Sequence, residues 1–118
     1  MIADVRQMNG ITVVDIEGRF DAVSASKTKA RLHELIAAGH TRLLLNLQGM
    51  DFIDSEGLGV LVSCLRRTAL ENGTLRLADV PPFCRSIFEL TGLTRVFDVT
   101  RALDQTLRAM AQEATDRR

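Results

Sequence analysis

The sequence has few aromatic residues and no excess charge of either sign. It contains no tryptophan and no tyrosine, and its 15 Lys and Arg residues balance 15 Asp and Glu residues. The scarcity of aromatic rings argues against a surface on which the bases of single-stranded nucleic acid stack. The balanced charge lacks the basic excess typical of proteins that bind nucleic acid or anionic membranes. We therefore expect neither as a partner.

Long apolar runs are also missing. No segment approaches the roughly 20 apolar residues that a membrane-spanning helix needs. Residues 1–10 include Asp4 and Arg6, where a signal peptide would be continuously apolar. These features predict a cytoplasmic protein without direct membrane insertion.

Cysteine and histidine are too sparse to suggest a metal or redox site. Cys64 and Cys84 lie far apart and form neither a C-x-x-C pair nor a zinc-binding pattern, so we expect buried free thiols. His33 and His40 lack metal-ligand companions at suitable spacing and are expected at the surface. Phosphate-binding glycine loops and the G-x-S-x-G nucleophile motif are absent. The sequence thus predicts no metal, no cofactor and no enzymatic activity.

The composition is ordinary for one globular domain, which we place at residues 1–118. Hydrophobic residues make up 46% of the chain and charged residues 25%, enough apolar material for a core. The five phenylalanines are expected mainly in that core or at its boundary. Two segments rich in β-branched residues, 2–8 and 11–20, flank Asn9-Gly10 and predict a β-hairpin.

Helical periodicity indicates two long helices in the first two thirds of the chain. Ser24 or Ser26 is expected to begin the first helix, and Gly39 to end it. The second starts in the segment 54–59 and ends before Asn72. Its predicted buried stripe consists of Leu58, Leu61, Val62, Leu65 and Ala69.

The remaining elements follow from short apolar runs and turn residues. They are a strand at 42–47, a strand at 74–78, a short helix at 83–90, a strand at 96–99 and an amphipathic helix at 103–114. The resulting order, ββαβαβαβα, predicts an α/β fold with a mixed, mostly parallel sheet and helices packed against it.

The segment 54–59 is the most informative motif, because it joins a buried strand to the clearest helix. A helix N-terminus favours a negative group, and Glu56 fits there. Either Asp54 or Ser55 is expected to cap the helix. Gly57 and Gly59 each cost about 1 kcal/mol relative to alanine inside a helix. Such a pair indicates close approach of another backbone or of a partner.

This segment, together with Gly18-Arg19-Phe20-Asp21-Ala22 and the order of elements, resembles the STAS domain family and within it the bacterial anti-sigma factor antagonists. The resemblance covers nearly the whole chain. It implies a non-catalytic protein that binds a serine-kinase anti-sigma factor and releases the sigma factor held by that kinase. The kinase then phosphorylates the antagonist, and a phosphatase restores it.

The resemblance places the usual phosphoacceptor hydroxyl at position 56, where this chain has glutamate. Glu56 cannot accept phosphate on a hydroxyl, and it already carries a negative charge. Glu56 imitates a phosphoserine only in part. Glutamate carries one charge and two acceptor oxygens, whereas phosphoserine carries about −1.5 to −2 charges and three acceptor oxygens. Ser55 occupies the usually unmodified position, so we favour a capping role for it over phosphorylation.

Helical geometry predicts one face formed by Glu56, Val60, Ser63 and Arg67, turned away from the buried stripe. The resemblance implies that the partner docks around this helix and the loop that carries Asp21. The predicted partner contacts are Asp21, Asp54, Gly57, Gly59, Val60, Ser63 and Arg67. The alternative for each is an ordinary solvated helix face.

Two functions remain open from the sequence. The first is an anti-sigma factor antagonist in a partner-switching pathway. The alternative is a STAS accessory subunit of a membrane transport system, which binds the transporter ATPase and needs no phosphorylation. The missing hydroxyl at Glu56 favours this alternative, whereas the rest of the motif favours the antagonist.

Overall fold

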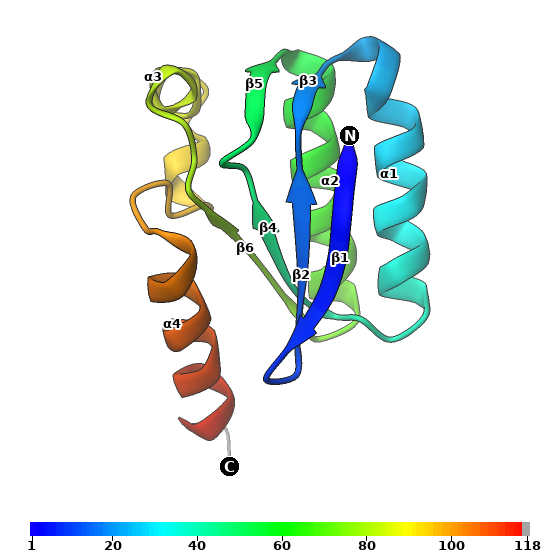
Figure 1. Ribbon diagram of the computed structural model, residues 1–118, viewed down its shortest axis with the longest axis vertical. Helices are drawn as coiled ribbons and strands as arrows, with labels where there is room; N and C mark the ends of the chain where they lie inside the picture. Colours follow the sequence, from blue (N-terminus) through cyan, green and yellow to red (C-terminus); the bar gives the residue numbers. More distant parts are fainter. Residues whose placement is uncertain (117–118) are drawn as a thin grey trace.

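Four strands form the main β-sheet, in the order β1-β2-β4-β6 (Figure 1). The structure, a computed structural model, describes residues 1–116. β1 (Ile2–Met8) runs antiparallel to β2 (Ile11–Ile16). β4 (Arg42–Asn46) pairs in parallel with β2 on one side and with β6 (Thr74–Ala78) on the other. This mixed, mostly parallel sheet confirms the predicted α/β fold.

The turn between β1 and β2 has the backbone conformation that its sequence predicts. Asn9 and Gly10 both have positive φ angles, 53° and 79°, as a type I′ turn requires. Met8 pairs with Ile11 across the turn, so the predicted hairpin is confirmed.

A second sheet of two short strands departs from the predicted order of elements. The segment predicted as one strand at 11–20 is interrupted after β2, where Gly18 takes a φ of +78° that glycine adopts readily. β3 (Gly18–Phe20) then pairs in parallel with β5 (Met50–Ile53). Because each short strand leads directly into a helix, this pairing brings the starts of two helices together.

Helices cover both faces of the main sheet (Figure 1). α1 (Ala22–Ala37) and α2 (Ser55–Leu70) pack side by side on one face, and α4 (Leu103–Asp116) lies on the other. Successive side chains of β2 point to opposite faces of the sheet. Val14 packs in the larger core, on the side of α1 and α2, and Val13 packs in a smaller core beneath α4. Within residues 1–116, no helix is both long and apolar enough to cross a membrane.

Between β6 and α4 the chain forms α3 (Pro82–Leu90) and a 3-10 turn, η1 (Leu93–Arg95), but no strand. The strand predicted at 96–99 is therefore wrong. The N–H of Phe97 donates back to the first carbonyl of η1 at 2.9 Å, which keeps this backbone coiled rather than extended. Phe97 and Val99 are nevertheless buried, and this alternation resembles the pattern of a strand.

Both cysteines are free and fully buried, as the sequence predicts. Burial raises the pKa of the Cys64 thiol to about 12 and that of Cys84 to about 11. The thiolate form, which is the reactive one, is therefore disfavoured at neutral pH.

Phe88 anchors α3 to the core, whereas Phe83 on the same helix is 50% exposed and departs from the expectation for phenylalanine. The Phe88 ring meets Phe97 edge to face, with centroids 6.3 Å apart. We expect Phe88→Ala to lower the free energy of unfolding by about 3–5 kcal/mol. We expect Phe83→Ala to lower it by less than about 1 kcal/mol. Urea denaturation measures both, and equal losses would contradict this packing.

Candidate functional site

Asp21 ends the loop between β3 and α1 and caps the helix. Its Oδ1 accepts hydrogen bonds from the N–H groups of Val23 and Ser24 at 3.0 and 3.4 Å. In return, the Ser24 hydroxyl oxygen accepts a bond from the Asp21 N–H at 3.2 Å, which completes a capping box. The helix therefore begins just after Asp21, and the prediction that Ser24 or Ser26 begins it is wrong.

Asp54 caps α2 in the same way and also reaches α1. Its Oδ1 accepts from the N–H groups of Glu56 and Gly57 at 2.9 and 3.1 Å. Its Oδ2 accepts from the N–H of Ala22 at 3.3 Å, so one carboxylate bonds the first turns of both helices. Ser55 is the first residue of α2 and is exposed, so its predicted capping role is wrong.

The two glycines of the motif have different environments. A Cβ atom on Gly57 would lie 2.3 Å from the carbonyl oxygen of Phe20, a contact that no side chain tolerates. The N–H of Asp54 donates to that same carbonyl at 3.3 Å, so α2 starts directly against the end of β3. A Cβ atom on Gly59 would meet nothing within 4 Å. The close approach of the Phe20 backbone thus explains why residue 57 is a glycine. Gly59 lies on the outer surface of α2, where no neighbouring atom requires a glycine.

Glu56 lies exposed in the first turn of α2, where the helix dipole favours its charge. Among the residues that the structure describes, none donates a hydrogen bond or forms an ion pair with its carboxylate. Beside it a hollow of about 280 Å³ opens between the two helices. The hollow is lined by Ala25, Ser26 and Lys29 of α1 and by Glu56, Gly59 and Val60 of α2.

Val60 does not belong to the exposed face on which the sequence places it. It is 4% exposed and belongs to the main core, because α1 packs against this side of α2. Val62 is only half-buried and Ala69 is exposed, so the buried side of α2 is rotated from the predicted stripe. Ser63 is half-buried and Arg67 exposed, and they remain on the outer side of the helix pair.

A hydrogen bond between the helices involves one of the histidines predicted to be at the surface. His33 Nε2 lies 3.2 Å from the hydroxyl of Ser63, and His33 is half-buried. Burial lowers the pKa of His33, and the positive charges of Lys29 and Arg67 lower it further. His40 is half-buried too, so each histidine lies only partly at the surface. The sequence spacing of His33 and Ser63 carries no signal of this contact.

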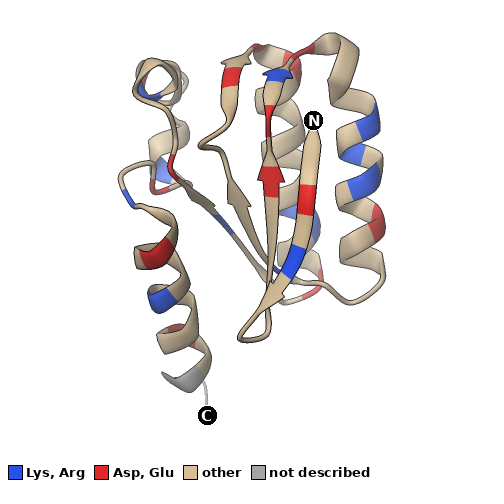
Figure 2. Ribbon diagram, in the orientation of Figure 1, with Lys and Arg blue, Asp and Glu red and all other residues tan. Residues whose placement is uncertain are grey.

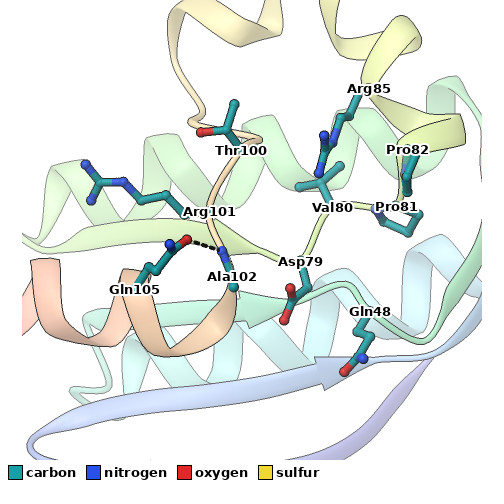
Figure 3. Close-up of a pocket in the computed structure, with 10 residues that line it drawn as sticks. All are labelled: Gln48, Asp79, Val80, Pro81, Pro82, Arg85, Thr100, Arg101, Ala102 and Gln105. Atoms are coloured by element: carbon teal, nitrogen blue, oxygen red, sulfur yellow. Dashed lines mark hydrogen bonds between the residues drawn. The ribbon is translucent and has the colours of Figure 1, made fainter.

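A second hollow, of about 370 Å³, lies where β4 and β6 end (Figure 3). Asp79 lines it, and the Oδ2 atom of Asp79 accepts from the N–H of Leu103 at 3.2 Å. The Gln105 side chain likewise accepts from the N–H of Ala102 at 2.9 Å. These polar groups are thus committed to the start of α4. Among residues 1–116, no group of three or more His, Cys, Asp and Glu is placed to hold a metal ion.

The glycine pair allows a matched test of the close approach of α2 to β3. We expect Gly57→Ala to destabilise the protein by about 1–3 kcal/mol or more, because its methyl group overlaps the Phe20 carbonyl. Gly59→Ala meets open space and should stabilise α2 by up to about 1 kcal/mol. Thermal or urea unfolding measures both. Changes of the same sign would contradict this geometry.

The half-buried position of His33 predicts a pH dependence of stability. Its pKa in the folded protein lies below the ordinary value of 6.5 that applies when the chain unfolds. The neutral ring therefore contributes stability above that pH, and this contribution is lost as the pH falls through the folded pKa. Between pH 7.5 and 5, unfolding free energy should fall more steeply for the wild type than for His33→Gln. Parallel profiles would show that His33 is not responsible.

Similarity to known proteins identifies the family of this chain. The model of the STAS domain family matches residues 3–109. The anti-sigma-B factor antagonist of Bacillus subtilis (strain 168) is 30% identical over 97 residues, which cover 82% of this chain and 88% of that protein. A crystal structure of an anti-sigma factor antagonist from Mycobacterium paratuberculosis has a TM-score of 0.81 at 26% identity, with 90% of each chain covered.

A structure of a serine-to-glutamate variant of RsbS from Moorella thermoacetica shares the fold. Its TM-score is 0.79 at 20% identity, and the match covers 95% of this chain and 97% of that one. The family match spans both sheets and the helix starts that form the site. The chain therefore belongs to the STAS domain family.

Proposed function

We propose that this chain is an anti-sigma factor antagonist that docks a serine-kinase anti-sigma factor through the outer side of α2, in the cytoplasm. The observation that carries the proposal is the exposed, unpartnered carboxylate of Glu56 in the first turn of α2. The family resemblance places the phosphoacceptor hydroxyl at this position. Glu56 would then set the affinity for the kinase through a permanent charge.

The hydrogen bonds at the site divide its residues into two groups. The first group serves the fold. The Asp21 and Asp54 carboxylates bond the helix starts, and the missing side chain of Gly57 lets α2 approach β3. The surface left for the partner is formed by Ser55, Glu56, Gly59, Ser63 and Arg67. We propose these as the direct contacts, with the first group positioning them.

The chemistry of glutamate predicts how the switch differs from one built on serine. A carboxylate carries a single charge and two acceptor oxygens, less than the about −1.5 to −2 charges and three oxygens of phosphoserine. We therefore propose that the affinity for the kinase is reduced but not abolished. At Glu56 the kinase finds no hydroxyl to phosphorylate, and a phosphatase finds no phosphoester to hydrolyse. The RsbS variant, which has a glutamate in place of a serine, shares the fold of this chain.

The absence of a hydroxyl at position 56 also favours a second candidate. A STAS subunit of a membrane transport system would bind its ATPase through the same face without any phosphorylation cycle. The two candidates differ in whether the face binds a kinase in a nucleotide-dependent manner.

Substitutions at Glu56 test the charge and the hydroxyl separately. Glu56→Gln removes the charge and keeps the shape, whereas Glu56→Ser supplies the hydroxyl. With an anti-sigma serine kinase and ADP, both should bind about tenfold more tightly than the wild type, a change of roughly 1.4 kcal/mol. With ATP, only Glu56→Ser should become phosphorylated and lose binding. Calorimetry and mass spectrometry give these readouts.

Ser55→Ala in the Glu56→Ser background is the control, and it should leave the phosphorylation intact. Equal affinities of the wild type and Glu56→Gln would contradict the role of the charge. Phosphorylation of the wild type at Ser55 would move the switch to that residue. Failure of every version to bind the kinase, with binding to a transporter ATPase, would favour the second candidate.

A further inference from the structure

The helix layer that carries Glu56 is positively charged in a neutral chain. α1 and α2 contain five Lys and Arg residues against two Glu residues, which leaves three net positive charges. The net charge of the whole chain is zero. Figure 2 shows basic residues along α1 and acidic residues at the turns that precede α1 and α2. The surface of the helix pair is therefore acidic where the helices start and basic farther along.

Three basic side chains, Lys29, His33 and Arg67, form what we call the basic cluster. The hydrogen bond between His33 Nε2 and the Ser63 hydroxyl, at 3.2 Å, joins α1 to α2 at the centre of the cluster. Lys29 precedes His33 by one helical turn on α1, and Arg67 follows Ser63 by one turn on α2. Both charges are close enough to act on His33 electrostatically. The cluster therefore spans the two helices.

The charges of this cluster have no acidic counterpart within the described part of the chain. Arg31 pairs with Glu34 on α1 at 3.7 Å, but Lys29 and Arg67 form no ion pair. Both side chains are exposed. Neighbouring like charges repel each other, and an acidic surface placed over them would relieve that repulsion.

The basic cluster is continuous with the hollow beside Glu56. Lys29 belongs to both, and it lines the hollow together with Gly59. Because Gly59 has no side chain and open space above it, a segment of another protein can approach the backbone of α2 closely there. Such a segment, lying across the helices from Glu56, would reach Lys29 first and Arg67 farther along.

We propose that the basic cluster binds an acidic segment of the partner protein, next to the region of the partner that meets Glu56. The identity of this partner rests on the proposed function, whereas the acidic character of the bound segment is inferred from the cluster itself. Charge pairs at the rim of an interface act mainly by accelerating association, and salt screens them. The cluster should therefore determine the association rate. Glu56 would set the affinity through its permanent charge, in the place of a phosphoserine.

The test compares two double variants that lose the same charge. Lys29→Gln with Arg67→Gln removes the cluster's permanent charges. Lys27→Gln with Arg31→Gln is the control, because Lys27 and Arg31 line a different hollow between α1 and β1. In stopped-flow association with the kinase at low salt, the cluster variant should be about tenfold slower, and the control within about twofold of the wild type. The wild-type rate should fall with added salt more steeply than that of the cluster variant.

A titration without the kinase tests the acidic chemistry independently. A short polyglutamate peptide added to the nitrogen-15-labelled protein should shift the amide resonances of Lys29, His33, Ser63 and Arg67. The cluster variant should lose these shifts, and a polylysine peptide should not produce them. No shifts, or equal shifts around Lys27 and Arg31, would overturn the proposal.

The outcomes separate this inference from the proposed function. If the kinase binds the wild type and the cluster variant at the same rate and with the same salt dependence, the inference is wrong and the proposed function stands. If the kinase binds neither, the proposed function fails for that partner, and the peptide titration still decides the chemistry of the cluster.

Discussion

The close approach of α2 to the last residue of β3 is the constraint on which the site depends. The Phe20 carbonyl lies where a side chain at position 57 would project, and it accepts the N–H of Asp54. Asp54 in turn bonds the first residue of α1. Because these contacts connect β3 with the first turns of α1 and α2, sliding α2 along its axis would break several hydrogen bonds at once. The direction in which Glu56 projects is therefore determined by backbone packing.

This constraint explains why the motif combines residues with different purposes. Gly57 and Asp54 face the protein and are required for the backbone arrangement, whereas Glu56 and Gly59 face outward. The negative charge of Glu56 also interacts favourably with the helix dipole, by about 0.3–1 kcal/mol. The charge proposed to control binding thus stabilises the free protein, and the helix needs no rearrangement to present it.

Local signals predicted much of this fold, and contacts between distant segments account for what the sequence missed. The Asn9-Gly10 turn and the strand at 74–78 depend on neighbouring residues, and both are confirmed. β3 and β5 are too short for periodicity to reveal, and they exist because they pair with each other. Val60 was misplaced because α2 is covered by α1 as well as by the sheet, so its buried side is wider than a single apolar stripe.

The separation of charge on the helix pair follows from the topology of the fold. β3 and β5 are parallel, so the helices that follow them both begin at the same end of the molecule. Helix starts favour acidic caps and acidic residues in the first turn, which places Asp21, Asp54 and Glu56 together. The basic residues are left to the helix bodies. A net charge of zero conceals this pattern, because a partner responds to charges within a screening length of about 8–10 Å. The polarity that a partner would meet on this face is thus a consequence of the parallel strand pairing.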